Sequence, residues 1–450
     1  MTAQPLRFIH AANLHLDCPL QDTGPLPDGL RTVVQSATLT AWDRIVEACL
    51  NRDVDFLLLS GNSFDEHDPG VRGQAALIAG CERLDATGIP VFIVPGQRDP
   101  ASAWLPGLRL PKNVTLFDRP GVETVEIGGD HSRLATLHGV NDFGARAGFE
   151  WATWPDATPA ALRSRAADIA PHIALLPCGL SDIDAGDRLT LTRDRLANLV
   201  AQRGTAASIR YWACGDNARR CTLPIRDAVA HAPGTPQGLT PAETGPRGAT
   251  LVEIEASGAV RLDLIPTPPV RWESCSLTLD HSTTRDDLLI SMQSALRDIP
   301  HHDSDRLWLV HWTITLPPAV REQLADDDLE KSLSDELLAS SGMDGGPRGC
   351  PAWSRRFRWR ETASRVEAEP AASGVAAPLE LHAERDIALA TEFRRFVAAL
   401  ESQPQWMPRR LEESTLNGSP WNSRLAQFVS ELDEADIAVH VRQLGEELFR

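Results

Sequence analysis

The sequence predicts an α/β protein whose N-terminal part, up to about residue 280, forms two mixed sheets flanked by helices. Short β-rich apolar segments alternate there with amphipathic helical segments. Two of the apolar segments, residues 55–60 and 90–95, are each followed by a glycine. Between residues 114 and 140 short strands follow one another without helices. Alternation of strands and helices implies parallel pairing with right-handed crossovers, and the helix-free stretch favours a second sheet.

Hydrophobic periodicity predicts the individual elements of this part. Residues 7–11 have the composition of a strand, and residues 38–52 carry Leu39, Trp42 and Ile45 at helical spacing. Further strands are predicted at residues 55–60, 90–95, 114–117, 122–127, 133–140, 172–176, 210–214, 221–225, 249–255 and 260–265, and further helices at 72–87 and 192–203.

Three shorter regions follow, so that the predicted domain is residues 1–271. Residues 272–367 form a small α/β domain of capping type, with strands at 276–280, 307–316 and 353–362 and helices at 285–296 and 321–340. Residues 368–378 are rich in Ala and Pro, which is typical of a linker. Residues 379–450 hold two amphipathic helices, 379–400 and 423–449, as a candidate partner-binding segment.

Composition narrows the partners and the compartment. The net charge is −18, Lys occurs only at positions 112 and 331, and no basic stripe suited to duplex DNA is visible. We therefore expect DNA contact only indirectly or through a complex. No apolar stretch approaches the ~18 residues of a membrane span, and no signal peptide precedes the first strand, so the expected location is cytoplasmic. Eight cysteines without a Cys-x-x-Cys pair indicate buried reduced thiols rather than a zinc site.

Polar clusters follow four of the predicted strands. They are His-Ala-Ala-Asn-Leu-His at 10–15, Gly-Asn-Ser-Phe-Asp at 61–65, Gly-Gln-Arg-Asp at 96–99 and Gly-Asp-Asn-Ala at 215–218. Ligands of parallel sheets bind beyond the carboxyl ends of the strands, so these clusters are expected to form one site.

These clusters resemble the strand ends of the calcineurin-like metallophosphoesterase superfamily, which have Asp-x-His, Gly-Asp-x-x-Asp, Gly-Asn-His-Asp and Gly-His-x-His. Residues 88–96, 211–215, 233–238, 243–248 and 270–273 are similar to the bacterial DNA-repair exonuclease subgroup (SbcD/YhaO-like), in the same order. The resemblance covers about residues 6–280. It implies a four-layer α/β/β/α sandwich with a small α/β capping domain and C-terminal helices. It also implies cleavage of phosphodiesters with two divalent ions, usually manganese.

The residues at the implied metal site differ from the family pattern. Of seven ligand positions only His15 matches, and Arg98 stands where the family has the His that protonates the leaving group. The six changed ligand positions are Asn13, Asn62, Gln97, Pro177, Asp216 and Ala218. A neutral amide at position 62 cannot bridge two cations as a carboxylate does, so we expect no metal and a vestigial polar pocket. Asp65 and Asp99 match acidic residues outside the ligand set of the family.

Two alternatives remain for the pocket. One is a weak single-metal site for manganese or another divalent ion, formed by His15, His138 and Asp216. The other is a metal-free anion pocket that uses an arginine: Arg98, Arg219 or Arg220.

The sequence thus predicts a catalytically inactive scaffold or binding subunit in DNA maintenance. By resemblance, its partner would be an SMC-like coiled-coil ATPase gripped by the helices of residues 379–450, and the chain could form a homodimer. The alternative is an active metal-dependent phosphodiesterase or exonuclease with an altered metal site. A degenerate paralogue without a biochemical role is the third hypothesis.

Overall fold

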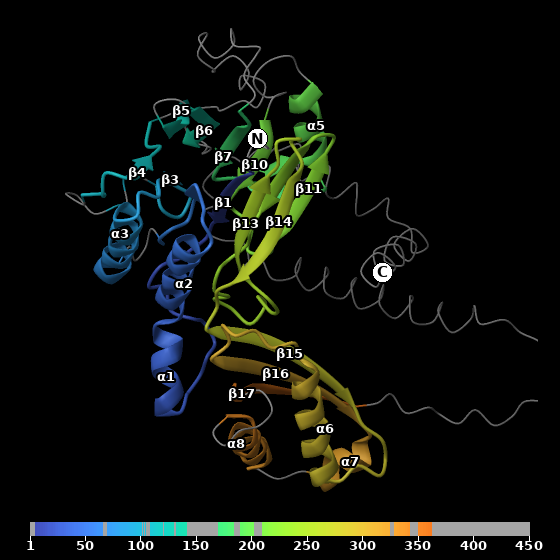
Figure 1. The fold of residues 1–450 in the computed structure, drawn as a ribbon. Helices are drawn as coiled ribbons and strands as arrows, with labels where there is room; N and C mark the ends of the chain where they lie inside the picture. Colours follow the sequence, from blue (N-terminus) through green and yellow to red (C-terminus); the bar gives the residue numbers. More distant parts are fainter. Residues whose placement is uncertain are drawn as a thin grey trace, which may run out of the picture. The chain divides into compact units, whose positions relative to one another are not determined.

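The structure is a computed structural model, drawn in Figure 1, and the chain splits into two compact units, Met1–Ser364 and Arg365–Arg450. It describes residues 5–65, 70–100, 102, 104, 109–119, 121–129, 132–141, 170–183, 190–201, 209–324, 328–342 and 350–361. The predicted linker of residues 368–378 and the predicted helices of residues 379–450 lie outside these described residues.

The first sheet has six strands in the order β14-β13-β1-β2-β3-β4. β1 pairs in parallel with β2, as do β2 with β3 and β3 with β4, whereas β13 is antiparallel to β1. The parallel pairing predicted from strand–helix alternation is therefore confirmed. The strands are β1 (Leu6–Ala11), β2 (Phe56–Ser60), β3 (Val91–Val94), β4 (Val114–Leu116), β13 (Gly248–Ile254) and β14 (Val260–Pro266).

The second sheet also has six strands, in the order β11-β12-β10-β7-β6-β5. Its centre is parallel, because β10 pairs in parallel with both β7 and β12 and β6 pairs in parallel with β7. The strands are β5 (Gly121–Gly129), β6 (Ser132–Asn141), β7 (His172–Leu176), β10 (Ile209–Cys214), β11 (Cys221–Ile225) and β12 (Ala228–Ala232).

Three apolar cores hold these sheets and their helices in four layers. On β1, Ile9 faces α2 (Ala37–Asn51) and α3 (Val71–Asp85), while Phe8 faces the second sheet. Between the sheets, Phe8 and Phe56 meet Tyr211 and other side chains of the second sheet. The outer face of the second sheet packs on α5 (Arg193–Ala201). Alternating side chains thus serve two different cores, which is the period of a strand buried on both faces. The predicted four-layer α/β/β/α sandwich is confirmed.

A separate sheet of three parallel strands contains β15 (Val270–Thr278), β16 (Leu307–Leu316) and β17 (Ala352–Glu361). Its helices are α6 (Arg285–Asp298), α7 (Pro318–Gln323) and α8 (Leu329–Gly342). The helix predicted at residues 321–340 is thus two helices. The predicted boundary between residues 271 and 272 falls inside β15, and the division of residues 1–367 into two domains stays a prediction.

The sequence interpretation missed β15's first half and several short elements. Arg271 lies inside β15 because its guanidinium is buried against Asp305 and Glu273, and a charged residue had argued against a strand there. The missed elements are α1 (Asp28–Gln35), β8 (Gly179–Ser181), β9 (Thr190–Thr192) and β12. β12 reads Ala-Val-Ala-His-Ala, which has few residues of high β-propensity. Among the described residues no helix has both the length and the apolar character of a membrane span.

Candidate functional site

The candidate site lies where the carboxyl ends of β1, β2, β3 and β10 meet. The backbones of β2 and β10 touch here: a Cβ on Gly215 would lie 1.5 Å from the carbonyl oxygen of Ser60. Gly61 has φ +91°, and a Cβ there would be 3.0 Å from the Cα of Gly96 and 3.2 Å from the Cβ of Pro177. Only glycine fits such approaches, so the glycines after the strands bring the four polar clusters together.

Two asparagines form the centre of the site. The Asn13 amide donates to the carbonyl oxygens of Gly215 (2.6 Å) and Asn217 (2.8 Å). The Asn62 amide donates to Asn13 Oδ1 (2.8 Å) and to Asp216 Oδ1 (3.0 Å), and its oxygen accepts from the backbone N–H of Arg98 (3.1 Å). The side-chain amide of Asn62 therefore uses both donor hydrogens and its acceptor within the protein. We call this set of Asn13, Asn62 and Asp216 the amide network.

The loop after β1 has an unusual backbone. Asn13, His15, Asp17 and Asn62 all have positive φ, at 51°, 43°, 66° and 56°. This left-handed region is sparsely populated by residues with a Cβ, and the strain persists only where surrounding bonds enforce it. The enforcing bonds run from Asn13 N to Gly61 O (3.0 Å) and from His15 N to Asn62 O (3.1 Å).

A buried carboxylate holds the neighbouring loops. Asp99 is fully buried, and its oxygens accept the backbone N–H groups of Asn62 (2.8 Å), Ser63 (2.8 Å) and Gly96 (2.6 Å). Burial raises the pKa of Asp99 to about 7, although these N–H donors act in the opposite direction. The carboxylate therefore orders the loops after β2 and β3.

The remaining predicted residues surround this centre. Gln97 and Arg98 are exposed, and Arg98 pairs with Asp65 at 3.4 Å. Arg220 reaches the hydroxyl of Thr250 at 2.6 Å. Ala218 is exposed and uses its carbonyl oxygen to accept the N–H of Thr235.

The alternative metal site of His15, His138 and Asp216 is not assembled. His138 lies on β6 and bonds with Thr124 Oγ1 and His172 Nδ1, each at 3.0 Å. Among the described residues, the group of potential metal ligands is instead His15, Cys18 and Asp65, with ligand atoms all within 4.8 Å of one another. Sequence reasoning missed Cys18 because no spacing motif marks it. A turn in which Cys18 N donates to His15 O (3.0 Å) brings it close.

His15 itself is nearly buried, with 8% of its surface exposed, and its Nδ1 has no hydrogen-bond partner. Burial lowers the pKa of His15 to about 4, and the charge of Arg98 lowers it further, against the effects of Asp65 and Glu243. The imidazole is therefore neutral at pH 7.

The residues present do not fit the two-ion centre that the family pattern implies. Two adjacent cations need an anionic oxygen between them, whereas Asn62 points N–H donors at Asn13 and Asp216. The nearby guanidinium of Arg98 adds positive charge. No hydrolytic step through two metal ions follows from this arrangement.

Comparisons with known proteins agree with the fold. No family model matches the chain. It is 29% identical over 274 residues to the uncharacterized metallophosphoesterase YhaO of Bacillus subtilis (strain 168), which covers 60% of this chain and 63% of YhaO. The chain thus matches less than two thirds of the length of that relative.

Solved structures with a similar fold include the protein TT1561 of Thermus thermophilus, with 13% identity, a TM-score of 0.32 and coverage of 58% of this chain and 99% of that one. A dimetal phosphatase from Danio rerio has 12% identity, a TM-score of 0.35 and coverage of 56% and 93%. The strand-end motifs, the four-layer sandwich and the similarity to YhaO together show that the chain belongs to the calcineurin-like metallophosphoesterase superfamily.

Proposed function

We propose that this chain is a metallophosphoesterase homologue that does not hydrolyse phosphodiesters and acts as a binding or scaffolding subunit in the cytoplasm. The observation that carries the proposal is the amide network. Asn62, at the position of the bridging carboxylate, spends both N–H donors on Asn13 and Asp216 and its oxygen on Arg98 N. Two divalent ions would have to break these bonds and would find no bridging anion in return.

The strain in the loop after β1 supports the same proposal. Asn13 and Asn62 have positive φ, which asparagine adopts more readily than most residues with a Cβ. Their amides in turn tie β1, β2 and β10 together. Amide hydrogen bonds thereby supply the cohesion that metal coordination would otherwise contribute at these strand ends.

The proposed partner is an SMC-like coiled-coil ATPase in DNA maintenance, with DNA reached through that complex. Two sequence features support it: the amphipathic pattern of residues 379–450 and the net charge of −18, which disfavours direct binding to DNA phosphates. A homodimer is compatible with the same proposal.

The activity test uses the full chain with Mn²⁺, bis(p-nitrophenyl) phosphate and linear DNA. We expect no turnover above that of a matched His15→Ala variant. Mn²⁺-dependent hydrolysis that both His15→Ala and Asn62→Ala abolish would contradict the proposal and establish the active, altered phosphodiesterase instead.

The partner test compares substitutions in the predicted helix of residues 379–400. Phe393→Asp places a charge on the predicted apolar stripe and should weaken capture of a coiled-coil ATPase from the same cell, whereas Thr391→Asp introduces the same charge off that stripe. Equal capture by both variants would remove this helix from the proposal.

A further inference from the structure

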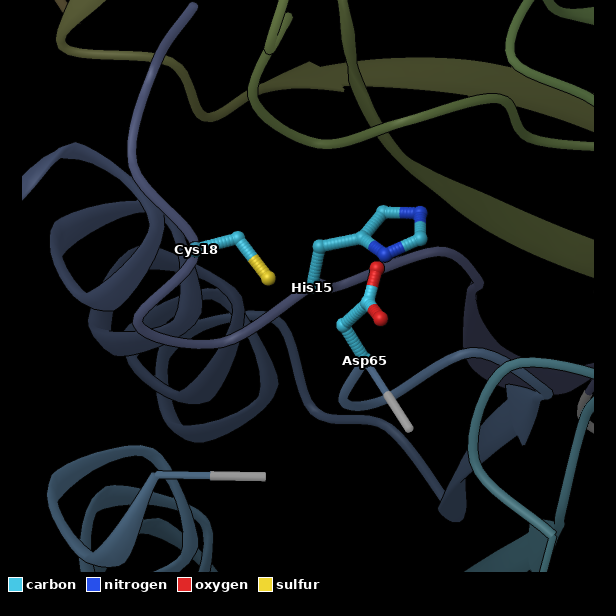
Figure 2. A group of neighbouring side chains, drawn as sticks. All are labelled: His15, Cys18 and Asp65. Carbon is cyan, nitrogen blue, oxygen red and sulfur yellow. The ribbon is translucent and has the colours of Figure 1, made fainter. Parts of the chain in front are cut away.

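Three side chains of metal-ligating type gather beside the amide network. The ligand atoms of His15, Cys18 and Asp65 all lie within 4.8 Å of one another. Figure 2 shows the Asp65 carboxylate next to the His15 ring, with the Cys18 side chain extending toward them from the loop after β1. Imidazole, thiolate and carboxylate are all ligands of Zn²⁺ in proteins.

A second observation points to a ligand at this place. His15 Nδ1 is buried and has no hydrogen-bond partner, and the residue exposes only 8% of its surface. Buried polar atoms of folded proteins are satisfied in the large majority of cases, so an unmet nitrogen beside a thiol and a carboxylate calls for an explanation. A bound metal ion supplies it.

We propose that His15, Cys18 and Asp65 form a mononuclear Zn²⁺ site with one coordination position left to water. Cys18 and Asp65 stand outside the seven ligand positions of the family pattern, and Asn62 takes no part, so this is a different site from the two-ion centre. The proposal does not depend on the scaffold function.

Charge and geometry support the assignment. A thiolate and a carboxylate together neutralise one Zn²⁺, and binding releases the thiol proton of Cys18. Bond lengths of about 2.0–2.3 Å in a tetrahedral site place ligand atoms roughly 3.5 Å apart, so the present separations need to shrink by no more than about 1.3 Å. The Arg98 side chain, which pairs with Asp65 at 3.4 Å, is 63% exposed and can turn into solvent as the metal binds.

The test titrates chelator-stripped full-length protein with Co²⁺ as an optical substitute for Zn²⁺. We expect a near-ultraviolet thiolate-to-cobalt band that saturates at one equivalent and is lost on adding Zn²⁺. Cys18→Ser should abolish the band and weaken binding at least about tenfold, and Asp65→Asn should weaken it comparably. Cys221→Ser is the matched control, because Cys18 and Cys221 are the two cysteines of intermediate burial. Arg98→Gln should strengthen binding, because it removes a competing cation.

Far-ultraviolet circular dichroism of each variant separates loss of a ligand from unfolding. Absence of the band in folded wild-type protein, its persistence in Cys18→Ser or its loss in Cys221→Ser would overturn the proposal. The two proposals fail separately. Zn²⁺-dependent phosphodiester hydrolysis would refute the scaffold function and leave the site intact, whereas an inactive protein without the cobalt band would refute only the site.

Discussion

Two polar networks join the same three strands, β1, β2 and β10, at different depths. Inside the sandwich, His10 bonds through Nδ1 to Tyr211 Oη (2.8 Å) and through Nε2 to Ser60 Oγ (2.7 Å). At the strand ends, Asn62 bonds to Asn13 and Asp216. The interior network uses strand backbone and is fully buried. The amide network uses residues with positive φ, and its Asp216 is exposed.

The difference shows which polar residues serve the fold and which face a ligand. His10 and its partners have no access to solvent, so they satisfy one another and lock the two sheets together. The strand-end residues stand where parallel sheets bind ligands, and here amides occupy that place. Asp99 belongs functionally with the interior, since it holds backbone N–H groups.

Truncation should separate the two networks most clearly. His10→Ala leaves the hydroxyl of Tyr211 without its partner and opens a cavity, and we expect it to lower the free energy of unfolding by about 2–4 kcal/mol. Asn62→Ala, whose partner Asp216 is exposed, should cost about 1–2 kcal/mol. Urea unfolding followed by tryptophan fluorescence measures both. A larger loss for Asn62→Ala would reverse the comparison.

Acid should act mainly on buried histidines. Burial, and then Arg220, lowers the pKa of His231 to about 3 from 6.5, and burial, and then His172, lowers that of His138 to about 3. These rings stay neutral in the folded chain but are protonated below pH 6.5 when it unfolds, so their stability contribution is complete above pH 6.5 and is lost as the pH falls toward 3. At pH 5 the loss is about 2 kcal/mol for each ring.

The measurement is the difference in unfolding midpoint between pH 7.5 and pH 5.0. His231→Gln should show a smaller difference than the wild type, because glutamine takes up no proton. His281→Gln, in an exposed turn, is the control and should behave as the wild type does. Equal differences for all three proteins would exclude His231 as a source of acid sensitivity.

Restoring a carboxylate should produce the smallest of these effects. Asn62→Asp removes the N–H donors to Asn13 Oδ1 and Asp216 Oδ1 and sets like charges together, and we expect a loss of about 1–2 kcal/mol without regained hydrolysis. Asn51→Asp, at an exposed helix end, should change stability by less than about 0.5 kcal/mol. Thermal unfolding with and without Mn²⁺ tests this. Strong Mn²⁺ stabilisation of Asn62→Asp would show that one substitution suffices to restore a metal centre.

Much of the fold was predictable because hydrophobic periodicity is local. The alternation in β1 and β2 that serves two cores is visible in the sequence, and the glycines after β2, β3 and β10 mark the strand ends. The first half of β15 was not predictable, because Arg271 becomes a strand residue only when Asp305 is brought beside it.

The sequence by itself determined the superfamily, the four layers and the replacement of ligand positions such as 13 and 62 by amides. Only the tertiary structure decided what those amides do, because the bonds of Asn62 depend on Asp216, which is 154 positions away along the chain. It likewise placed Cys18 and Asp65 around His15 and left His138 on another strand with His172. Residue types are local, whereas the contacts that give a polar side chain its role form only when distant strand ends meet.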